Sequence, residues 1–565
     1  MTDGANTLTG AEAMVRLLEA HGVSHIFGLC GDTSLPFYDA LYRLKPDIRH
    51  ILSRDERSAA YMADGYARVT GRVGVCEGPS GGGATYIAPG LVEANESSTP
   101  ILAITTDVST TSAGHYPLTE LDQGALFRPL TKWNGVLGQA ANLPTMVRAA
   151  FRAMTTGRPG AAHLAFPFDV QTAHIDPADI WAEPAHGTYP AWRVAPETGA
   201  VRLAAEALAS AKAPVVIAGG GVVISGAMAE LQTLAETLDI AVATTVSGQG
   251  SLPETHPNAV GVVGSNGGVP ATRAVVEAAD LVLFIGCRAG SVTTERWRHP
   301  PKGTRVLHID IDPMVIGATY PTEVALPADA KLSLAAVNAE LAGINHGAGR
   351  RGAERAMAAR ETKRAAFAAL AASDETPIRP ERIIAAMERH LDADAIVVAD
   401  PGTPCPYVSA HYTVRSAGRT VFSNRAHGAL GYSLSAAIGA HIGRPGVKTV
   451  SVMGDGSFGF TSGELETVAR LDLPITFLVL SNATYGWIKA GQKSGFGERY
   501  FSVDFSRTDH AAVAAAHGIR SWRVEDPADL DGALAAAFAH GGPSLVDIVT
   551  QPLHEAAAPV SEWVA

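Results

Sequence analysis

The chain has 565 residues, of which 47% are hydrophobic and 18% are charged. This length exceeds what one hydrophobic core usually serves, so we expect about three well-buried globular domains rather than a disordered or fibrous chain. The formal net charge of −12 argues against a general affinity for nucleic acid or for anionic membranes.

The cysteines and the N-terminus indicate the cellular compartment in which the protein acts. Cys30, Cys76, Cys287 and Cys405 stand far apart, without a C-x-x-C pair, which predicts reduced, buried thiols rather than disulfides or a metal site. Residues 1–10 lack a basic stretch followed by an apolar run, and the most apolar segments are short. We therefore expect a cytoplasmic protein without signal peptide or membrane span.

Apolar runs of strand length alternate with alanine-rich helical patterns along the chain. Examples are residues 101–105, 214–218, 281–285 and 475–480. This alternation predicts an α/β fold of doubly wound parallel sheets, with helices covering both faces of each sheet.

Two segments have the composition of domain boundaries. Residues 180–196 are rich in proline and turn formers and have no helical or strand period. Residues 343–372 form a charged, alanine-rich helical pattern that is typical of a surface linker. We predict an N-terminal domain over 1–180, a central domain over 196–342 and a C-terminal domain over 373–552.

The strongest chemical pattern lies in the C-terminal domain. An apolar run ends in Gly454-Asp455-Gly456, with a helix expected from about Ser462 to Ala469, and the next apolar run ends at Asn482. Parallel strands end at one edge of a sheet, and a carboxylate flanked by glycines lets a cation and a phosphate approach the backbone. Carboxylate, amide and carbonyl oxygens suit Mg²⁺. Alone, Gly-Asp-Gly would be an ordinary turn; the flanking elements favour a metal site.

These residues resemble a known signature. Residues 454–456 together with 481–482 are similar to the Gly-Asp-Gly … Asn-Asn motif of thiamine-diphosphate (ThDP) enzymes, with serine in place of the first asparagine. The resemblance implies that Asp455, Asn482 and the carbonyl of Thr484 hold Mg²⁺.

Further matches extend the resemblance through this domain. Residues 397–404 resemble the strand and loop before the diphosphate site, which implies that Gly402 and Thr403 lie near phosphate oxygens. In the segment that begins at His427, the match implies that the Gly428 carbonyl holds the exocyclic amine and that Leu430 is an apolar wedge under the bent coenzyme. The other coenzyme residues implied are Gly454, Gly456, Ser457, Tyr485 and Gly486.

The N-terminal domain supplies an acid. Residues 53–68 have helical period after a capping-type serine, Ser53, with an acidic first turn. The stretch resembles the family's His-Glu-x-x-Ala-x-x-Ala-Asp-Gly-Tyr-Ala-Arg pattern, with Asp55 in place of histidine, and the match makes Glu56 the catalytic residue. A glutamate in an apolar site is partly protonated near neutral pH, so it can donate to N1′ of the aminopyrimidine.

The substrate side departs from the pattern. Residues 115–123 lie where acetolactate synthases carry Phe-Gln-Glu, and here Leu118 and Thr119 replace the first two. This loop usually faces the substrate, so we expect a preference different from that of the biosynthetic enzymes. Structural roles stay open for His427 and for the aromatic residues. The substrate contacts implied by the matches are His115, Glu120, His427, Trp487 and Ile488.

The resemblance spans nearly the whole chain and implies a ThDP-dependent carboligase similar to acetolactate synthase. Such an enzyme decarboxylates a 2-oxo acid and transfers the acyl carbanion equivalent to a carbonyl acceptor. The alternatives are a 2-oxo acid decarboxylase, a C–C lyase or hydrolase acting on hydroxyketones or diketones, and a catalytically silent nucleotide-binding or regulatory paralogue. A nicotinamide dehydrogenase is disfavoured because residues 219–221 lack the third glycine of Gly-x-Gly-x-x-Gly.

The sequence indicates less about the ligand of the central domain and about the oligomeric state. In relatives the central domain binds FAD, another adenine nucleotide or nothing, and the arginine-and-acid cluster of FAD-binding members is altered at residues 288–295. FAD therefore stays open. In the family, the acid matched by Glu56 in one subunit meets the diphosphate held by the counterpart of Asp455 in another. The resemblance thus implies small-molecule carbonyl substrates and a homodimer at minimum, with a dimer of dimers common among relatives.

Overall fold

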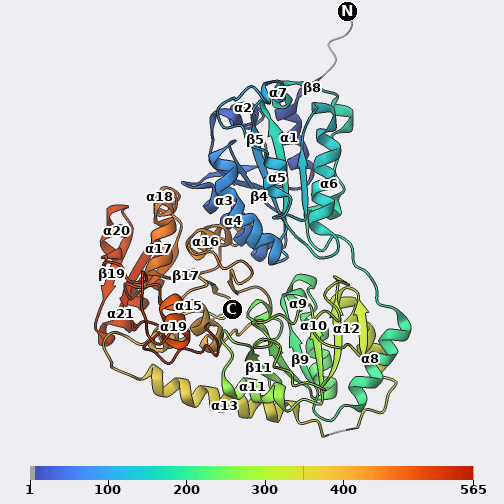
Figure 1. The fold of residues 1–565 in the computed structure, drawn as a ribbon, viewed down its shortest axis with the longest axis vertical. Helices are drawn as coiled ribbons and strands as arrows, with labels where there is room; N and C mark the ends of the chain where they lie inside the picture. The colour runs from blue at the N-terminus through green and yellow to red at the C-terminus, as the bar shows by residue number, and fades with distance from the viewer. Residues whose placement is uncertain (1–6, 348, 564–565) are drawn as a thin grey trace, which may run out of the picture. The chain divides into compact units, whose positions relative to one another are not determined.

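The structure is a computed structural model that describes residues 7–347 and 349–563 (Figure 1). The chain divides into two compact units. Among the described residues, unit 1 comprises residues 7–192, 426–445 and 461–471, and unit 2 comprises the others. Unit 1 contains one six-stranded sheet and unit 2 contains two.

Unit 1 is built on a parallel sheet with the strand order β3-β2-β4-β5-β7-β6. Its strands are β2 (His25–Gly28), β3 (Arg49–Leu52), β4 (Gly74–Gly78), β5 (Ile101–Asp107), β6 (Trp133–Val136) and β7 (Ala162–Pro167). Its helices before residue 193 are α1 (Gly10–Ala20), α2 (Leu35–Leu44), α3 (Glu56–Thr70), α4 (Gly82–Glu96), α5 (Gln123–Phe127), α6 (Leu143–Thr155) and α7 (Phe168–Thr172). A short antiparallel pair, β1 (Leu8–Thr9) and β8 (His174–Ile175), lies beside them.

Helix α3 carries the candidate acid at its first residue. Its N-cap is Asp55, whose side chain accepts a hydrogen bond from the Arg57 backbone N–H at 2.8 Å. The prediction that Ser53 caps this helix is wrong, because the Ser53 hydroxyl donates to the Gly28 carbonyl of β2. Asp55 is the stronger cap, since its carboxylate accepts an N–H and also places negative charge at the positive end of the helix. Glu56 is thereby fixed in the first turn.

Helix α16 (Tyr432–Gly443) packs against α3 within unit 1. Two glycines allow the two backbones to approach closely. A Cβ atom at Gly65 would overlap the carbonyl of Ala436, and a Cβ atom at Gly439 would overlap the carbonyl of Met62. Because both obstacles are backbone atoms, a larger residue at either position would push the helices apart.

Replacing Gly439 by alanine is expected to destabilise the protein by about 1–3 kcal/mol, the usual cost of overpacking a close contact. The urea unfolding midpoint measures this loss. The matched control is Gly532→Ala in helix α21 (Pro527–Ala539), where an added Cβ meets nothing within 4 Å. That change is expected to raise stability by up to about 1 kcal/mol, because alanine is the better helix former. Equal effects of the two changes would contradict the tight α3–α16 contact.

Unit 2 contains the central parallel sheet, with the strand order β11-β10-β9-β12-β13-β14. Its strands are β9 (Val215–Ala218), β10 (Ala241–Thr244), β11 (Ala259–Val262), β12 (Leu281–Ile285), β13 (Arg305–Asp310) and β14 (Val324–Pro327). The helices around it are α8 (Thr198–Ser210), α9 (Gly220–Ser225), α10 (Met228–Leu238), α11 (Pro270–Glu277), α12 (Ala330–Leu341) and α13 (Gly352–Ala371).

Alternate residues of the central strands enter two separate cores. Val216 and Leu283 pack with α8, α10 and α12, whereas Val215 and Phe284 pack with α11 and α13. Helices therefore cover both faces, as the nearly continuous apolar strands predict. The segment 343–372 is more than the surface linker we predicted, because its helix α13 contributes buried alanines to the second of these cores.

The C-terminal sheet, also in unit 2, has the strand order β16-β15-β17-β18-β20-β19 and is parallel throughout. Its strands are β15 (Ile396–Ala399), β16 (Val421–Ser423), β17 (Thr449–Gly454), β18 (Ile475–Ser481), β19 (Arg520–Val524) and β20 (Ser544–Val549). The nearby helices of unit 2 are α14 (Pro380–His390), α15 (Pro404–His411), α17 (Asp455–Thr461), α19 (Gly486–Gly495), α20 (His510–Ala516) and α21, whereas α18 (Leu465–Arg470) belongs to unit 1.

The helix predicted from about Ser462 to Ala469 is present as a 3₁₀ turn over Ser462–Glu464 followed by α18. A second helix, α17, was not predicted and starts at Asp455, directly at the end of β17. Its start there has a physical cause: the Asp455 carboxylate accepts the Gly456 backbone N–H at 2.9 Å, which satisfies a donor of the first turn.

The predicted fold class is confirmed, because the chain forms three parallel six-stranded sheets with helices between the strands. The four cysteines are free. Three of them are buried as predicted, but the prediction is wrong for Cys30, which is exposed in the turn after β2. Within residues 7–347 and 349–563, no helix combines the length and the apolar character that crossing a membrane requires.

Candidate functional site

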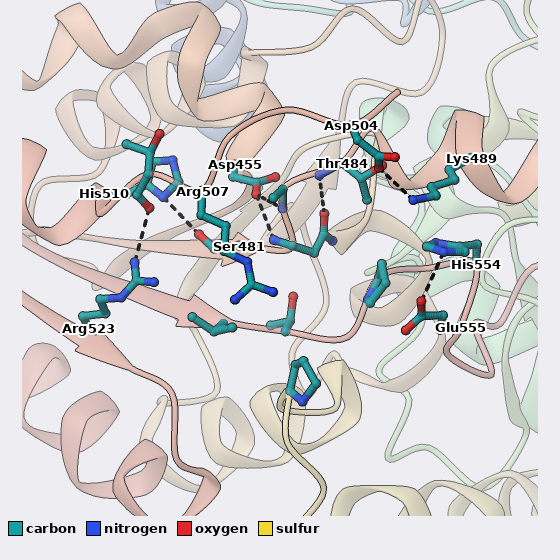
Figure 2. A pocket seen from close by; sticks show the side chains of 17 residues that line it. Asp455, Ser481, Thr484, Lys489, Asp504, Arg507, His510, Arg523, His554 and Glu555 are labelled. Atoms are coloured by element: carbon teal, nitrogen blue, oxygen red, sulfur yellow. Dashed lines mark hydrogen bonds and ion pairs between the residues drawn. The ribbon is translucent and has the colours of Figure 1, made fainter. Parts of the chain in front are cut away.

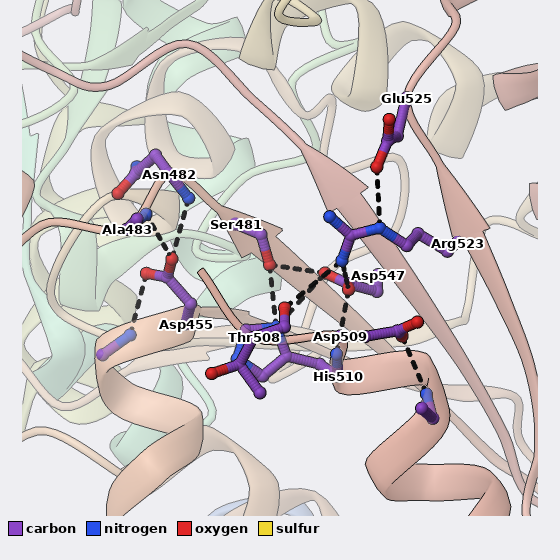
Figure 3. Close-up of polar contacts among 12 residues, drawn as sticks. Asp455, Ser481, Asn482, Ala483, Thr508, Asp509, His510, Arg523, Glu525 and Asp547 are labelled. Atoms are coloured by element: carbon purple, nitrogen blue, oxygen red, sulfur yellow. Dashed lines mark hydrogen bonds and ion pairs between the residues drawn. The ribbon is translucent and has the colours of Figure 1, made fainter. Parts of the chain in front are cut away.

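The carboxyl ends of β17 and β18 meet at the candidate metal site of unit 2 (Figure 3). One oxygen of Asp455, Oδ2, accepts from the backbone N–H groups of Asn482 at 2.8 Å and Ala483 at 2.6 Å. Burial raises the pKa of Asp455, and these N–H donors, with that of Gly456, oppose the shift. The structure therefore brings Asp455 and Asn482 together and fixes the carboxylate firmly.

The other predicted coenzyme residues of unit 2 follow the ends of neighbouring strands. The Ser457 hydroxyl donates to Asp400 Oδ1, beyond the end of β15, at 2.9 Å. A Cβ atom at Gly486 would lie 3.3 Å from Thr403 Oγ1, so the loops after β15 and β18 are close neighbours. The residues placed at this edge of the sheet are Gly402, Thr403, Gly454, Asp455, Gly456, Ser457, Asn482, Thr484, Tyr485 and Gly486.

A cavity of about 220 Å³ opens beside the Asp455–Asn482 pair (Figure 2). Its walls include Asp455, Asn482 and Thr484, the three residues predicted to hold magnesium, together with the cationic side chains of Lys489 and Arg507. A water molecule occupies about 30 Å³ in the liquid, so this volume accommodates a hydrated cation.

The atoms at this point suit a hard cation. Asp455, the Asn482 amide and the Thr484 carbonyl offer only oxygen ligands, which Mg²⁺ prefers. The Asn482 amide oxygen accepts a long hydrogen bond of 3.3 Å from the Thr484 backbone N–H, and the amide nitrogen is buried without a partner. Across the described residues, no three His, Cys, Asp or Glu side chains converge on a metal-sized site, so an ion here depends on amide and carbonyl oxygens. These residues fit Mg²⁺.

Ser481, which stands where the family motif has its first asparagine, belongs to a buried polar network (Figure 3). Its hydroxyl donates to Asp547 and lies 3.0 Å from His510 Nδ1. Asp547 Oδ2 also accepts from the His510 backbone N–H at 3.0 Å and from Arg523 at 2.7 Å. Burial alone would raise the pKa of Asp547. Hydrogen bonds from His510 and Ser481 act in the opposite direction, and the pKa is lowered. Through its hydrogen bond with Ser481, this buried carboxylate fixes the end of β18, directly before Asn482.

Helix α19 starts at Gly486 and carries two candidate substrate residues. Ile488 is 55% exposed, and Trp487 is half-buried. The Trp487 ring packs edge-on against Trp563, with 5.2 Å between centroids, and the Arg425 guanidinium lies 5.5 Å from its centroid. Trp487 is therefore held in place by its neighbours, whereas Ile488 is open to contact with a ligand.

In unit 1, the candidate acid Glu56 is 7% exposed. Burial raises the pKa of its carboxyl group, and the negative charges of Asp55 and Glu77 add to the rise. The turn after β4 is shaped around this side chain: a Cβ atom at Gly78 would lie 3.1 Å from Glu56 Cγ, and one at Gly83 would lie 2.9 Å from Glu56 Oε1. A buried acid with a raised pKa keeps its proton to higher pH, as a general acid must.

The loop before α16 holds the predicted residues His427, Gly428 and Leu430, also in unit 1. Gly428 has φ +77°, a left-handed conformation that favours glycine. The wholly buried Glu93 of α4 accepts from the backbone N–H groups of His427 at 2.8 Å and Gly428 at 3.4 Å, and it pairs with Arg68 at 3.5 Å. The sequence reasoning missed Glu93. The signal in the sequence was an acid within the apolar stretch of residues 87–94, near the end of α4, although that stretch does not identify the acid's partners.

His115 and Glu120 lie in the exposed loop before α5. Glu120 accepts from the Gly114 backbone N–H at 2.7 Å, which ties the two ends of the loop together. Tyr116 and Leu118 are 94% and 85% exposed. This loop therefore presents an apolar tip, the kind of surface that binds a ligand or another protein chain.

The glycine-rich turns of the central domain have a packing explanation. A Cβ atom at Gly219 would overlap the Gly286 carbonyl, and a Cβ atom at Gly221 would lie 2.6 Å from Gly286 Cα. Two strand-end turns thus approach backbone to backbone. The glycines at these positions are required by that approach whether or not a nucleotide binds.

Comparison with known families agrees with this arrangement. The thiamine pyrophosphate enzyme N-terminal TPP binding domain matches residues 8–126, the central domain of the same enzymes matches residues 201–337, and their C-terminal TPP binding domain matches residues 400–548. Thiamine pyrophosphate is another name for ThDP. The fold and the site of unit 2 thus define the class: enzymes that depend on thiamine pyrophosphate.

Curated relatives narrow the class. The chain is 35% identical over 556 residues to the "Probable acetolactate synthase large subunit" of Methanocaldococcus jannaschii, covering 96% of this chain and 92% of that protein. It is 34% identical over 561 residues to the protein of that name in Methanococcus aeolicus, with coverage of 96% and 92%. It is 31% identical over 533 residues to the "Acetolactate synthase" of Mycobacterium bovis, with coverage of 93% and 85%. The chain belongs to the thiamine pyrophosphate enzyme family, among the relatives of acetolactate synthase.

Proposed function

We propose that this protein is a ThDP- and Mg²⁺-dependent carboligase that takes an acyl unit from a 2-oxo acid and joins it to a carbonyl acceptor. The observation that carries the proposal is the contact of Asp455 with the Asn482 backbone at the ends of two adjacent parallel strands, beside a cavity of about 220 Å³. The resemblance of residues 454–456 and 481–482 to the signature of ThDP enzymes supports a metal at this point.

Each group has a proposed task. Asp455, Asn482 and the Thr484 carbonyl would hold Mg²⁺, and the backbone around Thr403 and Ser457 would face the diphosphate. When bound, ThDP supplies the carbon that adds to a carbonyl group and the ring that accepts the electrons released with carbon dioxide.

The remaining tasks fall to residues of unit 1. Gly428 would accept a hydrogen bond from the aminopyrimidine and Leu430 would support its bent shape. Glu56 would donate its proton to N1′, which requires the acid to be protonated near neutral pH. The burial of Glu56, which raises the pKa of its carboxyl group, supports this role.

The reaction itself is tested with purified protein, ThDP, Mg²⁺ and pyruvate. We expect acetolactate from pyruvate, identified by mass spectrometry, and faster turnover of another 2-oxo acid, since Leu118 and Thr119 predict a preference different from that of the biosynthetic enzymes. If acetaldehyde alone appears, the protein is a decarboxylase. If pyruvate is untouched while a hydroxyketone or diketone is cleaved, the protein is a lyase or hydrolase. Either outcome overturns the ligation proposal.

We also propose a homodimer as the smallest active form, with Glu56 of one subunit serving the coenzyme held at Asp455 of the other. A mixture of Glu56→Gln and Asp455→Asn chains, co-expressed with different tags, tests this. Half of the dimers formed at random are mixed, and each has one intact site of two, so about a quarter of wild-type activity should return. If both groups act within one chain, every site in the mixture is damaged and no activity returns.

We keep the three-domain division at 1–180, 196–342 and 373–552, which limited proteolysis tests. The absorption spectrum of the purified protein decides whether the central domain holds FAD, because the flavin absorbs in the visible range and is released on denaturation.

A further inference from the structure

A second carboxyl group, that of Glu77 on β4, lies near Glu56 in unit 1. The Glu77 side chain is wholly buried. Tyr38 of α2 donates its hydroxyl hydrogen to Glu77 Oε1, and His50 of β3 lies 2.9 Å from the Tyr38 oxygen and 3.6 Å from Glu77 Oε1. A Cβ atom at Gly28, the β2 residue paired with Glu77, would overlap Glu77 Oε1. The sheet thus leaves space for this carboxylate.

The two acids share one structural element. Gly78 follows Glu77 directly and contacts Glu56, because a Cβ atom there would lie 3.1 Å from Glu56 Cγ. The negative charge of Glu77 contributes to the raised pKa of Glu56. The pair is therefore coupled: two nearby buried carboxyl groups do not both ionise readily, and the first proton lost makes the second harder to lose.

The surroundings of the two carboxyl groups are unequal. Glu77 has a hydroxyl donor in Tyr38 and an imidazole in His50 that becomes cationic when protonated. Among the residues that the structure describes, no other residue's hydrogen-bond donor reaches the Glu56 carboxyl. Burial raises the pKa of Glu77, and its contacts with His50 and Tyr38 oppose that rise. Because no described residue makes such contacts with the Glu56 carboxyl, they favour the negative charge of the pair on Glu77.

We propose that Glu77 is a positioning residue for coenzyme activation: it carries the charge of the Glu56–Glu77 pair, with support from Tyr38 and His50, and so keeps the proton on Glu56. This rests on the proposed function, in which Glu56 must donate that proton.

Other charged and titratable groups face the pair. Asp55, on the same helix as Glu56, raises the pKa of Glu56, and it is itself paired with Arg57 at 3.3 Å. On the Glu77 side, the thiols of Cys30 and Cys76 have pKa values raised by burial and, in addition, by the charge of Glu77. These thiols stay neutral near pH 7, so they add no competing charge.

The direct test is an infrared titration of the protein without coenzyme, because a protonated carboxyl group and a carboxylate absorb at different frequencies. The difference between wild type and Glu56→Gln isolates Glu56. In the Glu77→Gln background, we expect the midpoint of Glu56 to fall by about one pH unit, a tenfold loss of proton affinity, since a neighbouring negative charge has been removed. Glu77→Asp, which keeps the charge, should stay near the wild-type midpoint.

Tyr38→Phe provides a second variant in case Glu77→Gln folds poorly. Loss of the hydroxyl donor destabilises the charge on Glu77, so the Glu56 midpoint should move the same way by a smaller amount. The matched control is Glu381→Gln, which removes a wholly buried carboxyl group of α14 in unit 2. This change should leave the Glu56 midpoint unchanged.

With the active enzyme, the alkaline limb of the kcat/KM profile should follow the same order. Activity needs protonated Glu56 and is lost as pH rises through its pKa, so the limb moves to lower pH in Glu77→Gln. An unchanged Glu56 midpoint in both Glu77→Gln and Tyr38→Phe overturns this inference while the proposed function stands. If the wild-type protein turns over no 2-oxo acid, the proposed function is wrong. The infrared titration needs no substrate, so it still tests whether Glu77 keeps the proton on Glu56.

Discussion

Glu56→Gln is expected to lower kcat by about 100- to 10,000-fold, the usual range for loss of a positioned general acid or base, while ThDP still binds. Glutamine keeps the size of the side chain and its place in the first turn of α3, but it has no proton to give to N1′. Steady-state kinetics with the preferred substrate measure the loss, and isothermal titration calorimetry checks that ThDP affinity changes by no more than a few fold.

The control for this change is Asp55→Asn. Asp55 caps the same helix, and asparagine caps about as well, so activity should change much less than in Glu56→Gln. A protein in which Glu56→Gln retains full activity would be a catalytically silent paralogue or an enzyme with another acid. Either result removes Glu56 from the mechanism.

Asp455→Asn is expected to weaken binding of Mg²⁺ and ThDP together by about 100-fold or more. Loss of an outer-shell partner alone typically costs about 10- to 100-fold in metal affinity, and Asp455 would be a ligand. Asparagine also presents an N–H₂ group toward the backbone N–H donors of Asn482 and Ala483 that now fix the carboxylate. Activity should vanish at ordinary coenzyme concentrations.

Thermal unfolding gives a readout that needs no substrate. At 100 times the dissociation constant, a ligand that binds only the folded protein adds about 2.7 kcal/mol of stability. Wild type should therefore melt at a higher temperature with ThDP and Mg²⁺, and Asp455→Asn should show no such rise. Asp531→Asn, an exposed acid paired with Arg389 on the same domain, should behave as wild type. A full rise in Asp455→Asn would remove Asp455 from the metal site.

Elements were predicted correctly where the residue types and the local hydrophobic period indicate the same structure. The buried strands at 281–285 and 475–480 were found because parallel strands covered on both faces are continuously apolar. The pairing of Asp455 with Asn482 followed from the same pattern, since adjacent parallel strands end at one edge. The start of α17 at Asp455 was missed because Gly456 and Gly459 are poor helix formers that conceal this short helix, and the side chain that accepts the first-turn N–H is that of Asp455 itself.

Contacts between distant segments could not be predicted. Glu93 accepts N–H groups from His427 and Gly428, more than 300 positions away, and no local pattern announces such a partner. Glu77 interrupts an apolar strand, which hints at a special role, but its partners on α2 and β3 depend on the fold. The Ser53 cap failed because Asp55, two residues later, competes better for the same helix end.

The backbone contacts between α3 and α16 have a practical consequence for engineering. Gly65 and Gly439 join the helix that begins with Glu56 to the helix that follows Leu430, so these parts move as one body and tolerate little variation. Mutant libraries aimed at new donors or acceptors should leave this pair of helices intact. They should randomise Ile488 and the tip around Leu118, whose side chains face outward and whose replacement costs little folding energy.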